Sequence, residues 1–398
     1  MAVGEAESIG DRGSAIHGAP VELTVLLPCL NEAETLGACI ELAQRTLCNL
    51  GVNGEVLVAD NGSSDGSLEI AARCGARVVN VTVRGYGAAV MDGIHSARGC
   101  FVIMADADGS YDLGSIAAFL KELRGGADLV MGNRFEGGIE AGAMSRLHRI
   151  GNPILSGIGR RFFGLSCGDL HCGMRGFRRS SIEELGLRSP GMEFASEMVV
   201  KAAIAQLRIA EVPTTLSKDG RSRKPHLRTW YDGWRHLRFL LLYSPRWLFF
   251  WPGVVLSIVG TTGTILLATG PKTVWSVVFD VKTELAMTIL ACLGGLLIVF
   301  AAAGRSFASA AGLLPRSERF RWWQDTLPLE RIIAIGFVMV LLGAVGWVLA
   351  TMQWSANDLE TLKRQFRMLI PSSGAALIGF ELMFGAFLVS ADRVLRPD

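Results

Sequence analysis

Four long apolar blocks set the strongest limit on what this chain can fold into. They cover residues 247–270, 285–303, 332–352 and 375–391, and each is close to the ~20 residues that a helix needs to cross a bilayer. Hydrophobic residues make up 50% of the 398 residues, and the mean hydropathy is +0.36. The blocks predict an all-α transmembrane domain of four helices over residues 247–398.

The basic residues around these blocks predict an orientation. The segment between the second and third blocks is rich in arginine, whereas the segment between the first two holds two lysines. Because basic loops remain cytoplasmic, we expect an integral protein of the cytoplasmic (inner) membrane with its N-terminal domain and C-terminus in the cytoplasm. Lys363, Arg364 and Arg367 in the last outside loop weaken this contrast. Only Glu381 is ionisable within a block, which predicts anchoring and lipid docking rather than an ion pathway.

Two segments flank the remaining part of the chain. Residues 1–20 are rich in Gly and Ala, lack a secretory signal and predict a disordered lead-in. Residues 227–246 place Trp230 and Trp234 on one helical face with arginines beside them, which predicts an amphipathic interfacial helix. The eight cysteines form no disulfide framework and favour a reducing compartment.

Residues 21–226 alternate between strand and helix patterns. The predicted strands are Val21–Leu27, Glu55–Ala59, Arg77–Val81 and Cys100–Met104, and a helix is expected from about Glu34 to Leu50. Polar turns close the strands, as in a doubly wound α/β sheet whose site lies along the carboxyl edge.

The turn Asp106-Ala107-Asp108 follows the last of these strands. Two carboxylates one residue apart offer hard oxygen ligands, which suit Mg²⁺ or Mn²⁺ shared with substrate phosphates. This predicts a metal-assisted transferase with a diphosphate-linked donor. A polar loop that merely closes a strand is the alternative for this motif taken alone.

Three further turns at the same sheet edge carry unusual polar or small residues. Asn31 and Glu32 follow the first strand, Asp60 follows the second, and Gly85 and Gly87 begin the next helix. Asp60 would accept hydrogen bonds from a base or ribose, and the glycines would let backbone approach a ligand closely. Together these turns predict a nucleotide site.

The chain resembles the family 2 glycosyltransferases of GT-A (Rossmann-like) fold. Within that family it is most similar to dolichyl- and polyprenyl-phosphate mannose or glucose synthases. Four motifs in order carry the likeness: Pro28-x-x-Asn31-Glu32, Asp60-Asn-Gly-Ser-Ser-Asp65-Gly, Gly85-x-Gly87-x-Ala89 and Asp106-Ala-Asp108. The resemblance implies nucleotide binding by Pro28, Asn31, Glu32, Asp60, Gly85, Gly87 and Asp106, and metal binding by Asp106 and Asp108.

Later motifs agree with this resemblance. The block from Asp169 to Arg175 resembles the family's Asp-x-x-Ser-Gly-Phe-Arg, and Gly220-Arg221-Ser222-Arg223 stands where members carry Gly-x-Ser-Lys. One departure concerns the metal: Gly109-Ser110 replaces the common Leu-Gln, and either Ser110 or Asp112 would have to supply the missing ligand.

The resemblance also assigns roles around the reacting phosphates. The resemblance implies that Arg134, at the end of a strand, makes a bidentate contact with a phosphate. The other candidates for holding donor and acceptor phosphates are Arg175, Arg221, Ser222 and Arg223. Asp169 and Asp108 are the candidate catalytic carboxylates. Asp169 would act either as a base or as a positioning group, because a lipid phosphate is already ionised and is itself nucleophilic.

Two features of the basic region allow more than one interpretation. Residues 144–163 carry an apolar stripe of Leu147, Ile150, Ile154, Ile158 and Phe162, interrupted at Asn152-Pro153, with arginines beside it. This pattern fits a helix at a membrane surface and equally one packed on the sheet. Cys167, His171 and Cys172 lack a fourth ligand at the spacing of a zinc site.

These observations predict an inverting, metal-dependent transfer of one hexose from UDP-glucose or GDP-mannose to polyprenyl or dolichyl phosphate. The expected partners are the nucleotide-sugar, the lipid phosphate and membrane lipids, with no nucleic acid; oligomers are compatible with the sequence. A processive polysaccharide synthase is an alternative, although Arg246-Trp247 retains only the end of the Gln-x-x-Arg-Trp motif. A non-catalytic membrane scaffold is the third reading, and the intact aspartates oppose it.

Overall fold

The computed structural model describes residues 20–222, 229–310, 314, 318–352 and 359–395. The chain divides into two compact units, Met1–Leu240 and Leu241–Asp398. The predicted lead-in lies outside the described residues except for Pro20, and the predicted phosphate ligand Arg223 lies outside them as well.

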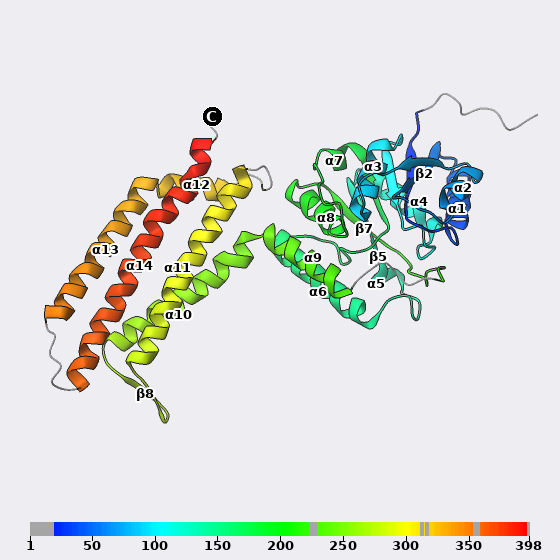
Figure 1. The fold of residues 1–398 in the computed structure, drawn as a ribbon. Helices are drawn as coiled ribbons and strands as arrows, with labels where there is room; N and C mark the ends of the chain where they lie inside the picture. The colour runs from blue at the N-terminus through cyan, green and yellow to red at the C-terminus, as the bar shows by residue number, and fades with distance from the viewer. Residues whose placement is uncertain (1–19, 223–228, 311–313, 315–317, 353–358, 396–398) are drawn as a thin grey trace, which may run out of the picture. The chain divides into compact units, whose positions relative to one another are not determined.

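The first unit is built on a seven-stranded sheet (Figure 1). Its strands are β1 (Leu23–Cys29), β2 (Gly54–Asp60), β3 (Arg77–Asn80), β4 (Phe101–Met104), β5 (Leu129–Asn133), β6 (Arg175–Arg178) and β7 (Ile209–Pro213). The order across the sheet is β3-β2-β1-β4-β6-β5-β7, and β6 runs antiparallel to both of its neighbours. The predicted α/β class is therefore confirmed, with one reversed strand that the sequence pattern did not indicate.

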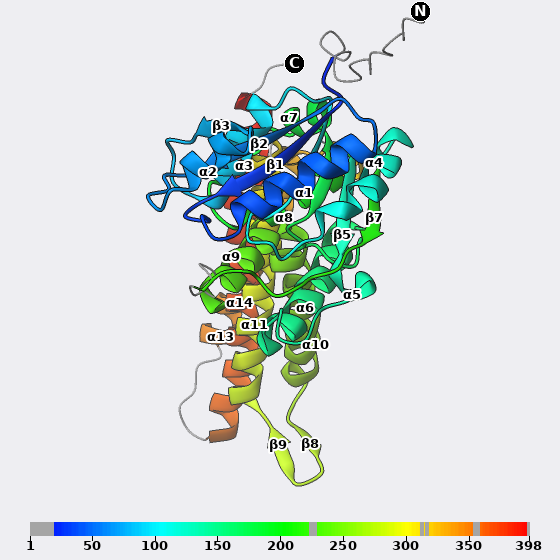
Figure 2. The ribbon, with the colours of Figure 1, turned by 90° about the vertical axis from the view of Figure 1, so that its right-hand side faces the viewer.

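Helices cover both faces of this sheet. They are α1 (Leu36–Asn49), α2 (Ser67–Arg73), α3 (Tyr86–Ser96), α4 (Ile116–Arg124), α5 (Arg134–Gly137), α6 (Arg146–Phe163), α7 (Arg179–Glu183), α8 (Phe194–Ile204) and α9 (Thr229–Leu242), with a 3₁₀ turn η1 (Leu113–Ser115). Alternate residues of β1 face opposite layers: Val25 packs with α1 and α4, whereas Leu26 packs with α3 and α8. Figure 2 looks onto the face covered by α1.

The carboxyl ends of the parallel strands are aligned by their register. Cys29 lies opposite Asp60, and Leu26 lies opposite Met104. β1 therefore continues through Pro28 and Cys29 instead of ending at Leu27 as expected, because both residues still pair with β2. The turns after β1, β2 and β4 emerge side by side at one edge.

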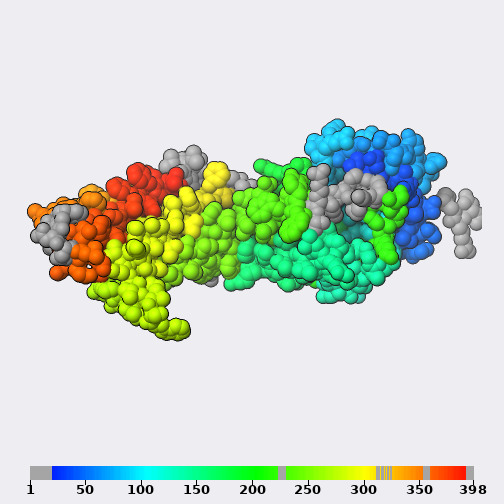
Figure 3. Space-filling model, turned by 60° about the horizontal axis from the view of Figure 1, so that its bottom comes forward, coloured from blue at the N-terminus to red at the C-terminus, as the bar shows by residue number. Residues whose placement is uncertain are grey.

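After β7 the chain crosses this same edge. Leu216 forms single bridges with Tyr111 and Ile139, and the following residues run past the turn that begins at Asp106. In the space-filling view (Figure 3) a green segment lies against the blue residues near the start of the chain. The loops at the carboxyl edge are thus covered by residues distant in sequence.

Helix α6 separates the two interpretations of its stripe. The helix is continuous through Pro153, so the residues Asn152-Pro153 that interrupt the apolar stripe do not break the helix. Ile150 and Ile154 are 62% and 57% exposed, whereas Ser156 and Gly159 form the buried side. The apolar stripe therefore does not pack on the sheet in this unit, and the small residues allow the opposite face to approach the protein closely.

The second unit consists of long helices. They are α10 (Trp251–Ala268), preceded by a π-helical turn Arg246–Phe250, α11 (Val281–Ala310), α12 (Glu318–Thr326), α13 (Leu329–Met352) and α14 (Leu359–Leu395), with a hairpin of β8 (Lys272–Val274) and β9 (Val277–Phe279). Within the described residues, four helices are long and apolar enough to cross a membrane: Arg246–Ala268, Val281–Ala310, Leu329–Met352 and Leu359–Ser390. This agrees with the predicted all-α domain of four helices.

The fourth helix begins earlier than expected. The predicted outside loop with Lys363, Arg364 and Arg367 is helical, because α14 starts at Leu359 and continues through Pro371. Arg367 and Lys363 pair with Asp280, which precedes α11. These ion pairs partly neutralise the two basic charges near the start of α14, and Lys and Arg both have a high intrinsic helix propensity.

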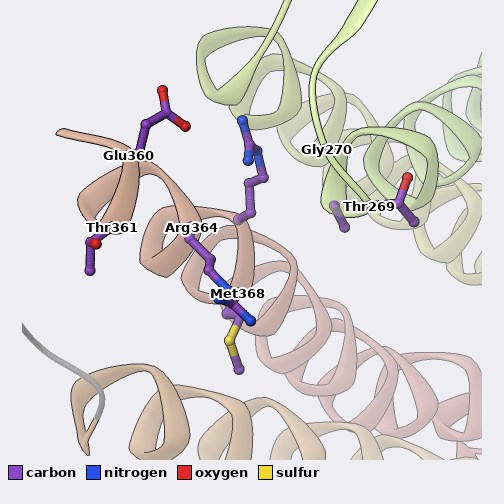
Figure 4. A pocket seen from close by; sticks show the side chains of 8 residues that line it. Thr269, Gly270, Glu360, Thr361, Arg364 and Met368 are labelled. Atoms are coloured by element: carbon purple, nitrogen blue, oxygen red, sulfur yellow. The ribbon is translucent and has the colours of Figure 1, made fainter. Parts of the chain in front are cut away.

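Small residues bring the membrane helices close together. A side chain at Gly260 would collide with the α11 backbone at Ala291, and one at Gly343 would collide with α14 at Ser372. Such contacts allow close packing where the hydrophobic effect between helices is weak. At one end of this unit lies a pocket of about 430 Å³ (Figure 4). It is lined by Ala268, Thr269, Gly270, Glu360, Thr361, Arg364, Arg367 and Met368.

Candidate active site

The two aspartates after β4 occupy different environments. Asp106 accepts a hydrogen bond from the Tyr86 hydroxyl at 3.1 Å. Burial, and then the charge of neighbouring Asp108, raises the pKa of Asp106 to about 6. A side chain at Gly173 would collide with the Asp106 carboxylate, so glycine at that position leaves room around it.

Asp108 is held by its own turn and by a distant arginine. Its Oδ1 accepts from the backbone N–H and the hydroxyl of Ser110, at 3.0 and 2.6 Å, and its Oδ2 accepts from Arg221 at 2.8 Å. Asp112, the other candidate for a missing metal ligand, caps η1 by accepting from the Gly114 N–H at 2.8 Å. Ser110 therefore lies with the carboxylate cluster, and Asp112 has a structural task.

The predicted nucleotide turns are joined by hydrogen bonds. Asn31 has a φ of 59°, and its backbone and side chain bond to Ser63 and Ser64 of the turn after β2. Asp60 is buried and accepts from the N–H groups of Gly62 and Ser63. The carboxylate of Asp60 thus shapes the turn on which we expected it to bind a base or ribose. Pro28 stays within β1.

Gly85 and Gly87 make a close approach, but to this chain's own backbone. A side chain at Gly85 would collide with the carbonyl of Pro190, and one at Gly87 with the carbonyl of Ser189. The Ala88 N–H donates to the Pro190 carbonyl at 3.1 Å. Both glycines therefore pack against residues 189–191, and the ligand contact expected from sequence stays a prediction.

Arg134 and Asp169 form a buried ion pair. The guanidinium donates through Nε and Nη2 to the two carboxylate oxygens, at 2.6 and 2.9 Å, and Asp169 is fully buried. The Gly168 and Asp169 N–H groups donate to Glu211. Of the two roles left open for Asp169, this geometry favours positioning over proton abstraction, because both oxygens already accept from Arg134.

Arg175 lies in the interior beneath this pair. Its guanidinium donates to three backbone carbonyls, those of Leu170, Cys172 and Ala195, at 2.8 to 2.9 Å, and the residue is 1% exposed. These bonds hold the loop before β6 to α8. They favour a structural task over the predicted phosphate contact, since a phosphate would have to displace them.

Arg221 and Ser222 follow β7 and connect Asp108 to the turn before α1. Arg221 donates to Glu32 as well as to Asp108, and Ser222 donates to Glu34 through its backbone and hydroxyl. The structure thus brings Glu32, Asp106, Asp108 and Arg221 into one cluster. The loop that contains Asp169 continues to Gly173, which lies against Asp106.

Sequence reasoning missed two tyrosines and a histidine pair. Tyr86 bonds to Asp106, and the Tyr111 hydroxyl accepts from the Gly173 N–H at 2.8 Å. Tyr86 stands inside the Gly85-x-Gly87 motif and Tyr111 directly follows Ser110, which was the available signal. His171 contacts His236 of α9, with ring centroids 4.6 Å apart. The His171 ring nitrogens have no hydrogen-bond partner among the described residues.

The carboxylates of this cluster are candidate ligands for a divalent cation. Within the described residues, no three His, Cys, Asp or Glu side chains form a ready-made metal site. Mg²⁺ and Mn²⁺ commonly need only one or two carboxylates, since water and substrate phosphates supply the other ligands. The guanidinium of Arg221 already stands as a cation between Asp108 and Glu32. Oxygen ligands, space at Gly173 and this stand-in cation therefore fit such an ion.

The mixed sheet, with its polar turns at one edge, defines the fold as a GT-A domain followed by a membrane-spanning region. The chain belongs to glycosyltransferase family 2 and is a glycosyltransferase. The model of that family, described as glycosyl transferase family 2, matches residues 24–186. A second model, described as the glycosyltransferase family 2 C-terminal transmembrane region, matches residues 302–392.

Similar proteins include two from Haloferax volcanii. The low-salt glycan biosynthesis hexosyltransferase Agl6 is 36% identical over 372 residues, covering 93% of this chain and 88% of that protein. A dolichyl-phosphate hexose transferase is 30% identical over 192 residues, covering 48% of this chain and 81% of that protein. Among solved structures, glucosyl-3-phosphoglycerate synthase from Mycobacterium tuberculosis with Mn²⁺, UDP and glucosyl-3-phosphoglycerate gives a TM-score of 0.43 at 21% identity, covering 55% of this chain and 78% of that one.

Proposed function

We propose that this glycosyltransferase transfers one hexose from a nucleotide-sugar, UDP-glucose or GDP-mannose, to polyprenyl or dolichyl phosphate, with inversion at the sugar. The observation that carries the proposal is the combination, in one family 2 chain, of the Asp106–Asp108 pair with membrane-spanning helices. The name of the similar dolichyl-phosphate hexose transferase supports a lipid phosphate as acceptor.

The donor side is the cluster of Asp106, Asp108, Glu32 and Arg221. Asp106 and Asp108 would hold Mg²⁺ or Mn²⁺, which when bound neutralises charge on the leaving diphosphate. Tyr86 orients Asp106 and Ser110 orients Asp108 through hydrogen bonds. The nucleoside would lie toward the turns of Asn31 and Asp60, because these turns emerge beside the aspartates at the same sheet edge.

The acceptor side is the region around Arg134 and Asp169. An acceptor phosphate oxygen would form the new bond to the anomeric carbon while the bond to the diphosphate oxygen breaks, which gives a lipid-phosphate sugar and a nucleoside diphosphate. Asp169 fixes the guanidinium of Arg134 through two hydrogen bonds. Nε and Nη2 of Arg134 are the atoms bonded to Asp169, so the remaining group, Nη1, would donate to the phosphate. No strong base is needed, because the phosphate is ionised at neutral pH.

The membrane elements would present the lipid to this site. The apolar stripe of α6 is exposed beside Arg146 and Arg149, and on α9 the exposed Trp230 and Trp234 lie on the same helix as Arg235. Exposed aromatic and aliphatic side chains next to arginines suit an interface with anionic head groups. The arginine-rich segment between the second and third spans supports a cytoplasmic catalytic unit.

The test is a transfer assay with membranes that contain the full chain. They are incubated with labelled UDP-glucose or GDP-mannose and a polyprenyl phosphate, and lipids are extracted into organic solvent. We expect an extractable, alkali-stable product that carries a single sugar with one of the donors. Label in a polymer would indicate a processive synthase, and no product with any donor would contradict the proposal and favour a scaffold.

A further inference from the structure

The residues that follow β7 form a strap, defined here as Leu216–Ser222. Its backbone bonds to the aspartate turn: the Ser217 N–H donates to the Ser110 carbonyl and the Gly220 N–H to the Asp108 carbonyl, each at 2.9 Å. At its end Ser222 donates to Glu34 on the turn before α1. The strap is therefore fastened on both sides of Arg221, which fixes where that side chain can reach.

Arg221 is shared by three carboxylates. Its Nη2 lies 2.8 Å from Asp108 Oδ2 and 3.0 Å from Asp219 Oδ2, and its Nη1 lies 3.1 Å from Glu32 Oε1. The side chain is only 13% exposed. One positive charge is thus shared among three carboxylates.

The oxygen of Asp108 that Arg221 holds is the one best placed for a cation. Oδ1 already accepts two hydrogen bonds from Ser110 within its own turn. Oδ2 is bonded to a residue 113 positions away, so it changes partner without disturbing the turn. A divalent cation and a guanidinium compete for this oxygen, because like charges at contact distance repel strongly where water is largely excluded.

We propose that Arg221 is a displaceable counter-ion of the donor cluster, which leaves Asp108 when a divalent cation binds. The exchange couples two events: the cation enters only as the guanidinium withdraws, and the withdrawn guanidinium becomes available to an anion that arrives with the cation. The class of ligand is a divalent cation with a nucleoside diphosphate. This inference rests on the proposed function for the second ligand, whereas the cation exchange stands without any transfer.

The first experiment measures Mn²⁺ binding to the purified full chain without a nucleotide-sugar, by the loss of the free-Mn²⁺ EPR signal. Arg221→Gln removes the competing charge and should tighten Mn²⁺ binding by about tenfold, whereas Arg221→Lys should stay close to the wild type. Arg124→Gln is the matched control, because Arg124 pairs with Glu22 in an exposed ion pair. Mn²⁺ affinity that is unchanged or weaker in Arg221→Gln would overturn the proposal.

A second measurement uses the wild-type chain and does not depend on whether a variant folds. Trypsin must bind the guanidinium of Arg221 to cut after it, so cleavage there requires that Arg221 leave its carboxylates. Mn²⁺ should accelerate this cut relative to the cut after exposed Lys218 on the same strap, followed by mass spectrometry. An unchanged ratio of the two cuts would contradict the exchange.

The two proposals fail separately. Mn²⁺ competition with Arg221 in a chain that forms no lipid-linked sugar would support the exchange and reject the proposed reaction. Lipid-linked sugar formed by a chain whose Mn²⁺ affinity ignores Arg221 would support the reaction and reject the exchange.

Discussion

The two arginine–aspartate contacts of the candidate site differ in the number of hydrogen bonds that join the partners and in how many acids share the guanidinium. Arg134 and Asp169 satisfy each other through two short hydrogen bonds in the interior, with Asp169 fully buried. Arg221 and Asp108 meet through one hydrogen bond, and the guanidinium is divided among further acids. A buried pair joined by two hydrogen bonds is costly to break, whereas a guanidinium shared among three carboxylates loses only one of its contacts when it leaves one of them. One pair is suited to support, and the other to exchange.

The largest expected effect is the loss of the Arg134–Asp169 pair. Asp169→Asn leaves a buried guanidinium without its counter-charge, and should lower the free energy of unfolding by about 3–5 kcal/mol. Thermal unfolding of the detergent-solubilised chain measures this. The double variant Arg134→Met/Asp169→Leu should recover much of the stability, because it removes both charges. A stability loss in Asp169→Asn below about 1 kcal/mol would show that the pair is not the support described above.

Asp108→Asn should have the opposite profile, with a large loss of activity and little loss of stability. Removing one carboxylate from the donor cluster should reduce transfer by about 10²–10³-fold, the range found when one electrostatic contact to a leaving or attacking group is lost. Asp112→Asn is the control on the same turn, since asparagine also caps a helix. Equal activity loss in both variants would point to damage to the turn instead of the cluster.

A smaller effect is expected from the histidine pair between the loop before β6 and α9. Burial, reinforced by Arg175, lowers the pKa of His236 to about 4 from its ordinary 6.5, and burial also lowers the pKa of His171. Between pH 6.5 and about pH 4, His236 binds a proton in the unfolded chain but not in the folded chain. Stability should therefore fall as the pH drops through 6.5 toward 4, by about 3 kcal/mol from His236 alone.

The measurement is the unfolding midpoint of the wild type and of His236→Gln over that pH range. Glutamine keeps a hydrogen-bonding group for Ser196, which bonds to His236 Nδ1 at 2.9 Å, but does not titrate. The slope with pH should be smaller in His236→Gln and unchanged in His95→Gln, a control outside the pair. Equal slopes in all three proteins would remove the histidine pair as the cause.

The smallest effect should come from an exposed pair of the same chemistry. Arg124 donates to Glu22 through two hydrogen bonds, yet its side chain is 53% exposed. Arg124→Ala should therefore cost less than about 1 kcal/mol in thermal unfolding. A cost comparable to that of Asp169→Asn would mean that the number of hydrogen bonds, and not burial, separates the two kinds of pair.

Much of the fold follows from local patterns in the sequence. Alternation of strands and helices indicated the α/β class, and the length of the apolar blocks indicated four membrane helices. The reversal of β6 could not be predicted, because its four residues carry the same pattern in either direction. The early start of α14 was missed since Lys363 and Arg364 read as loop charges, although both favour helices.

For the candidate site, the sequence indicated residues but not the contacts between them. The motifs pointed to Asp106 and Asp108, and the roles assigned to these residues remain predictions. The partners lie far apart in the sequence: 35 residues separate Arg134 from Asp169, and 113 separate Arg221 from Asp108. Gly85 and Gly87 are an example of a contact that the sequence cannot specify. The sequence pattern of a glycine turn is the same whether a ligand or the protein's own backbone comes close.

The antiparallel direction of β6 has a consequence for how α6 and its flanking loops are attached to the sheet. Because β6 enters the sheet from the carboxyl edge, the whole excursion from Arg134 to Asp169, including α6, leaves and returns at that edge. The Arg134–Asp169 pair closes this excursion into a ring at its base. The length of this excursion is thereby uncoupled from the register of the strands. The exposed face of α6 can therefore change while Ser156 and Gly159, which pack against Leu170, keep the helix in place.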